Sequence, residues 1–331
     1  MKKLRYELLD LEAWHGFDAE SAAPTFFARA AWGSAIAHVF PQFTPATMRC
    51  RLDDGSDVIV PLMREMGGRF RWKVYHGMPF GSYTAVLRRG TQVESGVAAR
   101  VLEGLLTLGD SVYLNPWPLE RPNLFRANIR IREETSVIDI SGGAEAALSR
   151  VDSKSKRMAG QARRRGVRCA IEKGDGAVDL YYNMLQEASR DRWHLATPRL
   201  PKEFIQRVCI EGKEFVEIWV ARFLDEPVGA GIALYGSQEV LLWTTVMRAG
   251  MENLKPHNIL HADIIEHAAR RGIHWYNLGS SAGLAGVLRF KESLGASSLP
   301  YDIFGHESIL YRANKALRGT LRNERTSPSV S

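Results

Sequence analysis

The 331-residue chain is poor in cysteine and has no long apolar run. Its three cysteines, Cys50, Cys169 and Cys209, lie far apart and form no CxxC pair. This spacing argues against a disulfide framework and a thiolate zinc site, and it is typical of a reducing compartment. No stretch approaches the ~18–20 apolar residues of a transmembrane helix, and acidic residues from Glu7 onward interrupt the region where a signal peptide needs its apolar core. We therefore expect a cytoplasmic protein without a transmembrane segment.

The composition excludes further classes of protein. With 45% hydrophobic and 24% charged residues, the chain is unlike a disordered, collagenous or fibrous protein, and its length suggests two domains or one large one. The net charge is +7, and residues 154–168 alone hold seven basic residues and no acid: Lys154, Lys156, Arg157, Arg163, Arg164, Arg165 and Arg168. Such a patch predicts a polyanionic partner, either phosphate groups, nucleic acid or anionic lipid headgroups.

Two halves of the chain repeat one layout of strands and helices. "ATMRCRLDDGSDVIVPLM" and "WVARFLDEPVGAGIALY" each predict a strand, a tight turn and a second strand. Each is followed by a helix and a short strand with an asparagine near its end, in "QVESGVAARVLEGLLTLGDSVYLN" and "ILHADIIEHAARRGIHWYNLG". The alternation of short strands and helices predicts an α/β or α+β layered fold, and the repetition suggests a tandem duplication.

The second half contains the clearest local patterns. Helical spacing predicts helices over residues 154–165, 177–193 and 202–211. A further helix begins at Pro256 and ends at Gly272. A buried strand "HWYNL", the glycine-rich loop "GSSAGLAG" and a short helix "VLRFKESLG" come next. We expect the polar residues 319–331 to form a disordered tail.

These residues resemble a known family. "RRGIHWYNLGSSAGLAGVLRFKESLGAS" resembles the signature of FemAB-like proteins, which belong to the GNAT acyltransferase superfamily and include the aminoacyltransferases that build peptidoglycan bridges. "SKSKRMAGQARRRGV", "RDRWHL" and "PKEF" resemble other parts of the family's pattern, and "FFARAAW" resembles its first-domain helix. The resemblance covers most of residues 20–305. It implies tandem GNAT-like domains, each a mixed, mostly antiparallel sheet flanked by helices, and transfer of an acyl or aminoacyl group to an amine.

The resemblance also implies where the domains lie. The first GNAT-like domain occupies residues 1–145 and is completed by residues 299–318, which pack back toward it. The second occupies residues 146–298 and carries the signature motif.

One departure from the superfamily concerns the acyl donor. GNAT enzymes that use acetyl-CoA hold its pyrophosphate with backbone N–H groups of a glycine-rich loop at a helix N-terminus. The corresponding stretch, "MENLKPHNILHAD", has no glycine and contains a proline, which lacks an N–H. FemAB-type enzymes, by resemblance, also lack this loop and use aminoacyl-tRNA. We therefore expect aminoacyl-tRNA as the donor, with acyl-CoA as the alternative, and no tightly bound cofactor.

The "RFK" motif supplies the expected catalytic residue, Lys291. An ammonium can stabilise the tetrahedral oxyanion of acyl transfer or hold a donor phosphate; the alternative is an exposed surface lysine. Arg192 and Trp193 suit a sugar, nucleotide or peptide, although the tryptophan could equally cap the core. The candidate substrate-binding residues are Arg192, Trp193, Tyr276, Gly279, Ser280, Arg289 and Phe290.

Other candidate residues have competing interpretations. The basic residues Lys154, Lys156, Arg157, Arg163, Arg164 and Arg165 form either a phosphate-binding helix face or a solvated run of charge. His257 and His261 stand four apart on a helix, but no third ligand is evident, so we interpret them as packed helix residues rather than zinc ligands. The sequence does not rank the candidates for a general base, which are Glu187, Asp191, Asp263 and Asp302.

These observations and the resemblance predict a FemAB-like N-acyltransferase or aminoacyltransferase that acts on an amine of a cell-envelope-type or small-molecule acceptor. The alternatives are an acyl-CoA-dependent GNAT enzyme and a non-catalytic polyanion-binding protein on a GNAT scaffold. We expect no DNA partner and no metal site, and peripheral contact with an anionic membrane surface stays open.

Overall fold

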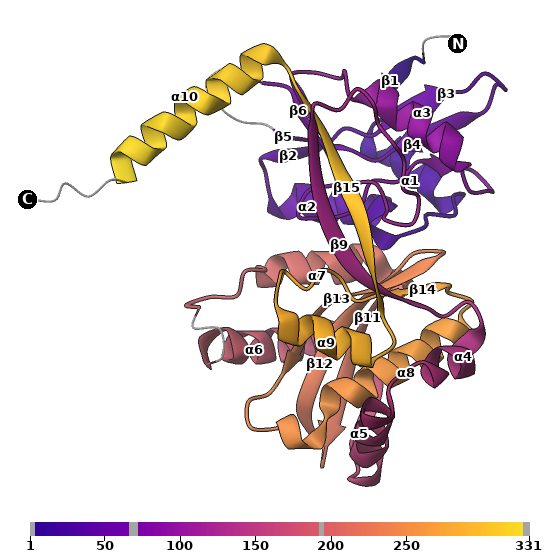
Figure 1. Ribbon diagram of the computed structural model, residues 1–331, viewed down its shortest axis with the longest axis vertical. Helices are drawn as coiled ribbons and strands as arrows, with labels where there is room; N and C mark the ends of the chain where they lie inside the picture. The colour runs from indigo at the N-terminus through magenta and orange to yellow at the C-terminus, as the bar shows by residue number, and fades with distance from the viewer. Residues whose placement is uncertain (1–3, 66–71, 192–194, 327–331) are drawn as a thin grey trace, which may run out of the picture. The chain divides into compact units, whose positions relative to one another are not determined.

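The computed structural model describes residues 4–65, 72–191 and 195–326, and its chain forms two compact units (Figure 1). Unit 1 comprises residues 1–21, 40–132 and 302–331, and unit 2 comprises residues 22–39 and 133–301. Two long strands, β9 (Ile129–Asp139) and β15 (Ser297–Glu307), each contribute residues to both units.

Unit 1 contains two groups of strands. The first is an antiparallel sheet in the order β1 (Tyr6–Leu8), β3 (Met48–Arg51), β4 (Asp57–Val60) and β7 (Leu87–Arg88). The turn between β3 and β4 includes Gly55, whose φ of +81° favours glycine. The second group has the order β2 (Phe43–Pro45), β5 (Met63–Glu65), β6 (Val74–Gly77), β8 (Ser111–Leu114) and β15. Only the β6–β8 pair in this group is parallel.

The helices of unit 1 are α1 (Leu11–Ala19), α3 (Ser95–Leu105) and α10 (Ile309–Thr326). Helix α3 buries Ala98, Val101, Leu102 and Leu105, which recur every three or four residues and therefore lie on one face. This face packs into a core that also contains Val112 and Leu114 of β8. The apolar face that this periodicity creates thus packs α3 against β8, the next strand in the chain.

Unit 2 is built on a mixed sheet in the order β10 (Arg168–Glu172), β11 (Val216–Phe223), β12 (Glu226–Tyr235), β13 (Glu239–Met247), β14 (Trp275–Asn277) and β9. Its neighbouring strands are antiparallel except for the parallel pair β13–β14. The last eight residues of β12, from Val228 to Tyr235, are all buried. Because both faces of this strand are covered, its sequence is continuously apolar or small rather than alternating.

The helices of unit 2 are α2 (Ala30–Val39), α4 (Gly143–Ser149), α5 (Ser153–Arg164), α6 (Asp175–Asp191), α7 (Lys202–Gly212), α8 (Pro256–Arg270) and α9 (Ala285–Ser293). Helix α8 begins with Pro256 and is followed by Gly272 at a φ of +73°, as predicted. Its buried residues Leu260, Ile264 and Ile265 belong to the same core as Tyr276 of β14. This packing fixes both α8 and β14 on the sheet.

The predicted fold class is confirmed, since each unit contains a mixed, mostly antiparallel sheet flanked by helices. The chain passes from unit 1 to unit 2 between Arg132 and Glu133, inside β9, rather than near residue 145. A continuous strand has no linker-like composition that would mark this boundary. The "FFARAAW" segment belongs to unit 2, where the Trp32 ring lies 5.2 Å from Phe204.

The C-terminal segment also differs from expectation, because α10 continues past Gly319 to Thr326. A single glycine does not end a helix whose neighbours favour helical structure. Across the described ranges, none of the helices combines the length and apolar character that a bilayer-spanning segment requires.

Candidate active site

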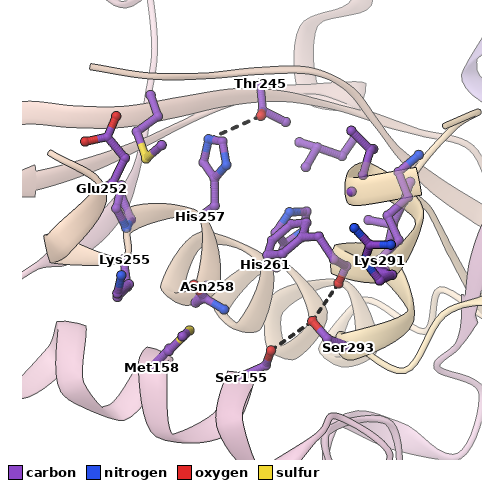
Figure 2. A pocket seen from close by; sticks show the side chains of 18 of the residues that line it. Ser155, Met158, Thr245, Glu252, Lys255, His257, Asn258, His261, Lys291 and Ser293 are labelled. Carbon is purple, nitrogen blue, oxygen red and sulfur yellow. Dashed lines mark hydrogen bonds between the residues drawn. The ribbon is translucent and has the colours of Figure 1, made fainter. Parts of the chain in front are cut away.

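A cleft of about 1100 Å³ opens in unit 2, where the signature motif and the basic helix meet (Figure 2). Its walls come from α5, the end of β13, the first turns of α8, and α9. One part of the lining is apolar and includes Leu242, Val246, Leu278 and Phe290. The polar part contains the basic residues and histidines Lys154, Lys255, His257, His261, Arg289 and Lys291, the two carboxylates Asp152 and Glu252, and Ser155, Thr245, Asn258 and Ser293. The four lysines and arginines outnumber the two carboxylates, so an excess of basic groups and an apolar surface line the same cleft.

Lys291 lies on α9 and lines this cleft, although only 7% of the residue is exposed. Its Nζ donates hydrogen bonds to the backbone carbonyl oxygens of Gly279, at 2.8 Å, and Ser280, at 2.9 Å. An ammonium has three donors, so one N–H remains for another acceptor. Burial lowers the pKa of Lys291 to about 8. The side chain therefore stays mostly protonated near neutral pH and is held in a fixed position.

The loop that holds Lys291 is itself fixed by Asn277 at the end of β14. The Asn277 Oδ1 atom accepts hydrogen bonds from the backbone N–H of Gly279, at 2.8 Å, and from Thr135 Oγ1, at 2.7 Å. Its Nδ2 donates to Glu239 Oε2 at 2.9 Å. Asn277 is completely buried, and Gly279 has a φ of +72°, which few other residues adopt. A buried amide thus positions the two carbonyl groups that bind the ammonium.

Two histidines on one face of α8 also line the cleft. His261 is 5% exposed, and its Nδ1 lies 2.7 Å from the hydroxyl of Tyr276. Burial lowers the pKa of His261 to about 3, with the nearby charges of His257 and Lys291 contributing less, so the ring stays neutral. One turn earlier, His257 Nε2 lies 3.4 Å from Thr245 Oγ1 (Figure 2). Their spacing of four residues in the sequence predicted that both histidines share one face of a helix. Only the folded structure shows that this face lines a cleft.

Asn258, in the first turn of α8, also lines the cleft. The residue is 7% exposed, and its Nδ2 has no hydrogen-bond partner within the described ranges. Nearby, the hydroxyl groups of Ser155 on α5 and Ser293 on α9 lie 2.9 Å apart (Figure 2). Sequence reasoning missed these three residues, because isolated serines and asparagines carry no distinguishing pattern.

The predicted basic helix is present as α5, but its charges have different environments. Arg163 pairs with Asp263 and, at 3.2 Å, with Glu266 of α8. Lys156 and Arg165 donate to the backbone carbonyl groups of Ser149 and Asn253, at 2.8 and 2.7 Å. The exposed residues Lys154, Arg157 and Arg164 have no such partner in the described part of the chain, and Lys154 lines the cleft. The three therefore make up the remaining basic stripe of α5.

The other predicted site residues fall into three groups. Arg289 and Phe290 line the cleft, and the Phe290 ring lies 5.6 Å from that of His261. Tyr276 is completely buried and reaches the cleft only through His261, while Gly279 and Ser280 bind Lys291 through their carbonyl groups. Arg192 and Trp193 lie outside the described residues.

None of the acidic residues considered as a general base lines the cleft. Glu187 lies 3.6 Å from Arg248, and Asp191 pairs with Arg190. Asp263 pairs with Arg163, and Asp302, in unit 1, lies 3.0 Å from Arg132. Within the described ranges, no group of three histidine, cysteine or acidic residues gathers as a metal site would require. His257 is thus a better placed proton acceptor than the four carboxylates.

Comparison with known proteins agrees with this geometry. Residues 149–292 match the model of a family described as the acetyltransferase (GNAT) domain, a range that begins just before α5 and includes Lys291. The chain contains a GNAT acyltransferase domain. The cleft lies almost entirely within this GNAT domain, and the protein is an acyltransferase. A search of curated protein sequences finds no match to the chain.

Solved structures share the fold of most of the chain. FemX superposes with a TM-score of 0.70 at 8% identity, covering 92% of this chain and 97% of FemX. A C-terminal domain from Agrobacterium fabrum, assigned to a putative lysylphosphatidylglycerol synthetase, has a TM-score of 0.51 at 11% identity and covers 86% of this chain and 90% of that domain. At these identities the likeness concerns the fold, which is FemAB-like.

Proposed function

We propose that the cleft transfers an acyl or aminoacyl group from an activated ester to an acceptor amine. The observation that carries this proposal is the buried ammonium of Lys291, held by the carbonyl oxygens of Gly279 and Ser280 beside an apolar wall. A positioned cation in a water-poor site stabilises a developing oxyanion far better than a solvated one does. Lys291 is such a cation, because two hydrogen bonds fix its position and most of the residue is buried.

In the proposed reaction, the amine nitrogen attacks the carbonyl carbon of the ester and forms a tetrahedral intermediate whose oxyanion faces Lys291. The carbon–oxygen bond of the ester then breaks and leaves an amide. The acceptor nitrogen loses a proton, and the leaving oxygen gains one. We assign the proton transfer to His257, because its ring lines the cleft, whereas burial lowers the pKa of His261 to about 3 and keeps that ring neutral.

Aminoacyl-tRNA is the donor that we favour. The basic stripe of α5 starts at the cleft with Lys154 and continues along the helix with Arg157 and Arg164, a spacing that suits a chain of phosphates better than a single one. The segment before α8 contains Lys255 in a left-handed conformation and is followed by Pro256, which has no N–H to offer a pyrophosphate. The name of the Agrobacterium neighbour also refers to an aminoacylated product, a lysyl lipid.

An acyl-CoA donor is the second candidate, and the matched family favours it, since that family is described by acetyl transfer. The unpaired Nδ2 of Asn258, in the first turn of α8, supplies a donor for a phosphate or amide oxygen. For the acceptor we propose an amine of a cell-envelope precursor, by analogy with the shared fold of FemX. A small-molecule amine would fit the same cleft.

Incubation with charged tRNA and with acyl-CoA, in the presence of a panel of amines, tests the proposal. Mass spectrometry follows loss of the donor and formation of the amide. We expect amide formation from charged tRNA that depends on Lys291. Turnover of acyl-CoA alone would promote the second candidate. Loss of neither donor, together with tight tRNA binding, would support a non-catalytic polyanion-binding protein instead.

A further inference from the structure

Helix α10 exposes apolar side chains over residues 309–317, the part of the helix whose side chains the structure describes. Ile309, Leu310 and Leu317 are 84%, 72% and 67% exposed. They are three of the eleven large hydrophobic residues that the described ranges expose, and they fall within nine residues. Leu310 and Leu317 are seven positions apart, which places them on the same face of a helix. Figure 1 shows α10 extending as a long helix from the end of β15.

Other side chains of α10 attach the helix to the rest of unit 1. The Tyr311 ring lies 5.6 Å from that of Trp72, edge to face. Lys315 donates to Glu307 Oε1 at 2.7 Å, and its Nζ lies 5.8 Å from the centre of the Tyr113 ring. Tyr311 and Lys315 are four positions apart and so share a face. These contacts therefore do not involve the face that carries Leu310 and Leu317. They also fix the orientation of the first turns of α10.

The charge of the segment indicates what this face meets. Residues 309–326 contain five basic residues and one acidic residue. An apolar stripe on a basic amphipathic helix is typical of helices that lie in the interface of an anionic membrane. A nucleic acid would not require exposed leucines, and a second copy of this chain would bring two basic helices together, which is unfavourable.

We propose that α10 binds peripherally to anionic lipid bilayers, with Leu310 and Leu317 inserted among the acyl chains and the net positive charge of the segment attracting it to the anionic headgroups. The helix lies on the membrane surface, since it lacks the apolar length to cross it. The residues of this surface belong to unit 1, and none of them is among the residues that line the cleft of unit 2. The proposal is therefore independent of the acyl transfer.

Co-sedimentation of the full chain with lipid vesicles tests this inference. We expect binding to vesicles that contain phosphatidylglycerol, weak binding to pure phosphatidylcholine vesicles, and weaker binding as salt concentration rises. The double variant Leu310→Asp, Leu317→Asp should lower the partition coefficient at least about tenfold. Its matched control is Ile210→Asp, Leu224→Asp, which removes two exposed apolar residues elsewhere, with the same change in charge. The control should bind as the wild type does.

Two further measurements keep the result unambiguous. Circular dichroism checks that both variants are folded, and Leu310→Gln, Leu317→Gln removes the apolar groups without adding charge. Absence of wild-type binding to anionic vesicles at low salt would overturn the proposal, as would equal loss in the variant and its control. If light scattering shows a wild-type dimer that the variant dissociates, the face binds a second copy instead.

Discussion

The ends of β8 and β14 can be compared, because at each of them a buried asparagine holds a loop in place. Asn115 directly follows β8 in unit 1, and Asn277 is the last residue of β14 in unit 2; both asparagines are buried, and the amide of each fixes a neighbouring loop. Asn115 Nδ2 donates to the carbonyl oxygens of Gly81 and Ser82, at 3.3 and 3.0 Å. The loop at Asn277 instead points two carbonyl oxygens at the ammonium of Lys291.

The two strand ends differ in the residues that come next in the chain. After Asn115 come Pro116 and Trp117, and the backbone N–H of Trp117 donates to the carbonyl oxygen of Thr84 at 3.0 Å. After Asn277 come a glycine-rich loop and α9, which carries Lys291 back to the strand end. Both units therefore have a strand whose end is held by a buried asparagine. The residues that follow the strand differ, and only those of unit 2 bring a lysine to the strand end.

The largest expected effect is that of Lys291→Met. Removing the charge while keeping the stem should lower turnover by ~100-fold or more, since one oxyanion donor contributes roughly 3–4 kcal/mol. Stability should change little, because relief of a buried charge opposes the loss of two hydrogen bonds. Single-turnover kinetics and thermal unfolding measure the two quantities. A fully active variant would show that the strand end of unit 2 is as inert as that of unit 1.

Replacing each asparagine by alanine tests the comparison directly. Both variants should lose about 2–3 kcal/mol of unfolding free energy, because each leaves buried polar groups unpaired. Asn277→Ala should also lower kcat about tenfold by loosening the Gly279 loop, whereas Asn115→Ala should not. If Asn277→Ala does not fold, Thr135→Val removes one of its bonds more gently. Equal kinetic effects of the two asparagines would contradict the assignment.

The basic stripe on α5 is expected to have a moderate effect. Arg157→Glu, Arg164→Glu should weaken binding of labelled tRNA about tenfold at low salt, with little change in stability, because both side chains are exposed. Arg163→Glu provides the contrast: it should destabilise the protein, since Asp263 and Glu266 lose their partner. Fluorescence anisotropy and denaturant unfolding separate the two outcomes. Unchanged tRNA binding by the double variant would show that the basic stripe is a solvated run of charge without a role in tRNA binding.

The sequence predicted the elements of the site better than their environments. The α8 helix, the strand "HWYNL" and the "RFK" helix all lie where their apolar periodicity and caps place them. Local patterns cannot show that Arg163 meets Asp263, or that His257 faces a cleft, because those contacts join residues far apart in the chain or depend on packing. The sequence also did not reveal the unit boundary, because it lies inside the continuous strand β9 and no linker-like composition marks it.

A separate prediction concerns the pH dependence of stability. The pKa of Lys291 falls from 10.5 to about 8 on folding. Between these values the unfolded chain keeps a proton that the native protein has lost, so unfolding free energy should rise with pH in this window. The wild type should therefore gain up to about 3 kcal/mol relative to Lys291→Met between pH 8 and pH 10.5. Denaturant unfolding of both proteins across this range measures the difference.

The most direct test of the central claim is the pH dependence of kcat/KM for wild type and Lys291→Arg with the donor that proves active. If a charged Lys291 stabilises the oxyanion, wild-type kcat/KM should decline above pH 8, as the ammonium with a pKa of about 8 loses its proton. The arginine variant should be slower at every pH, because its planar group places the charge differently, but it should lack this decline, since arginine stays protonated. A wild-type rate that rises steadily through pH 9, or an arginine variant with the same decline, would contradict the account.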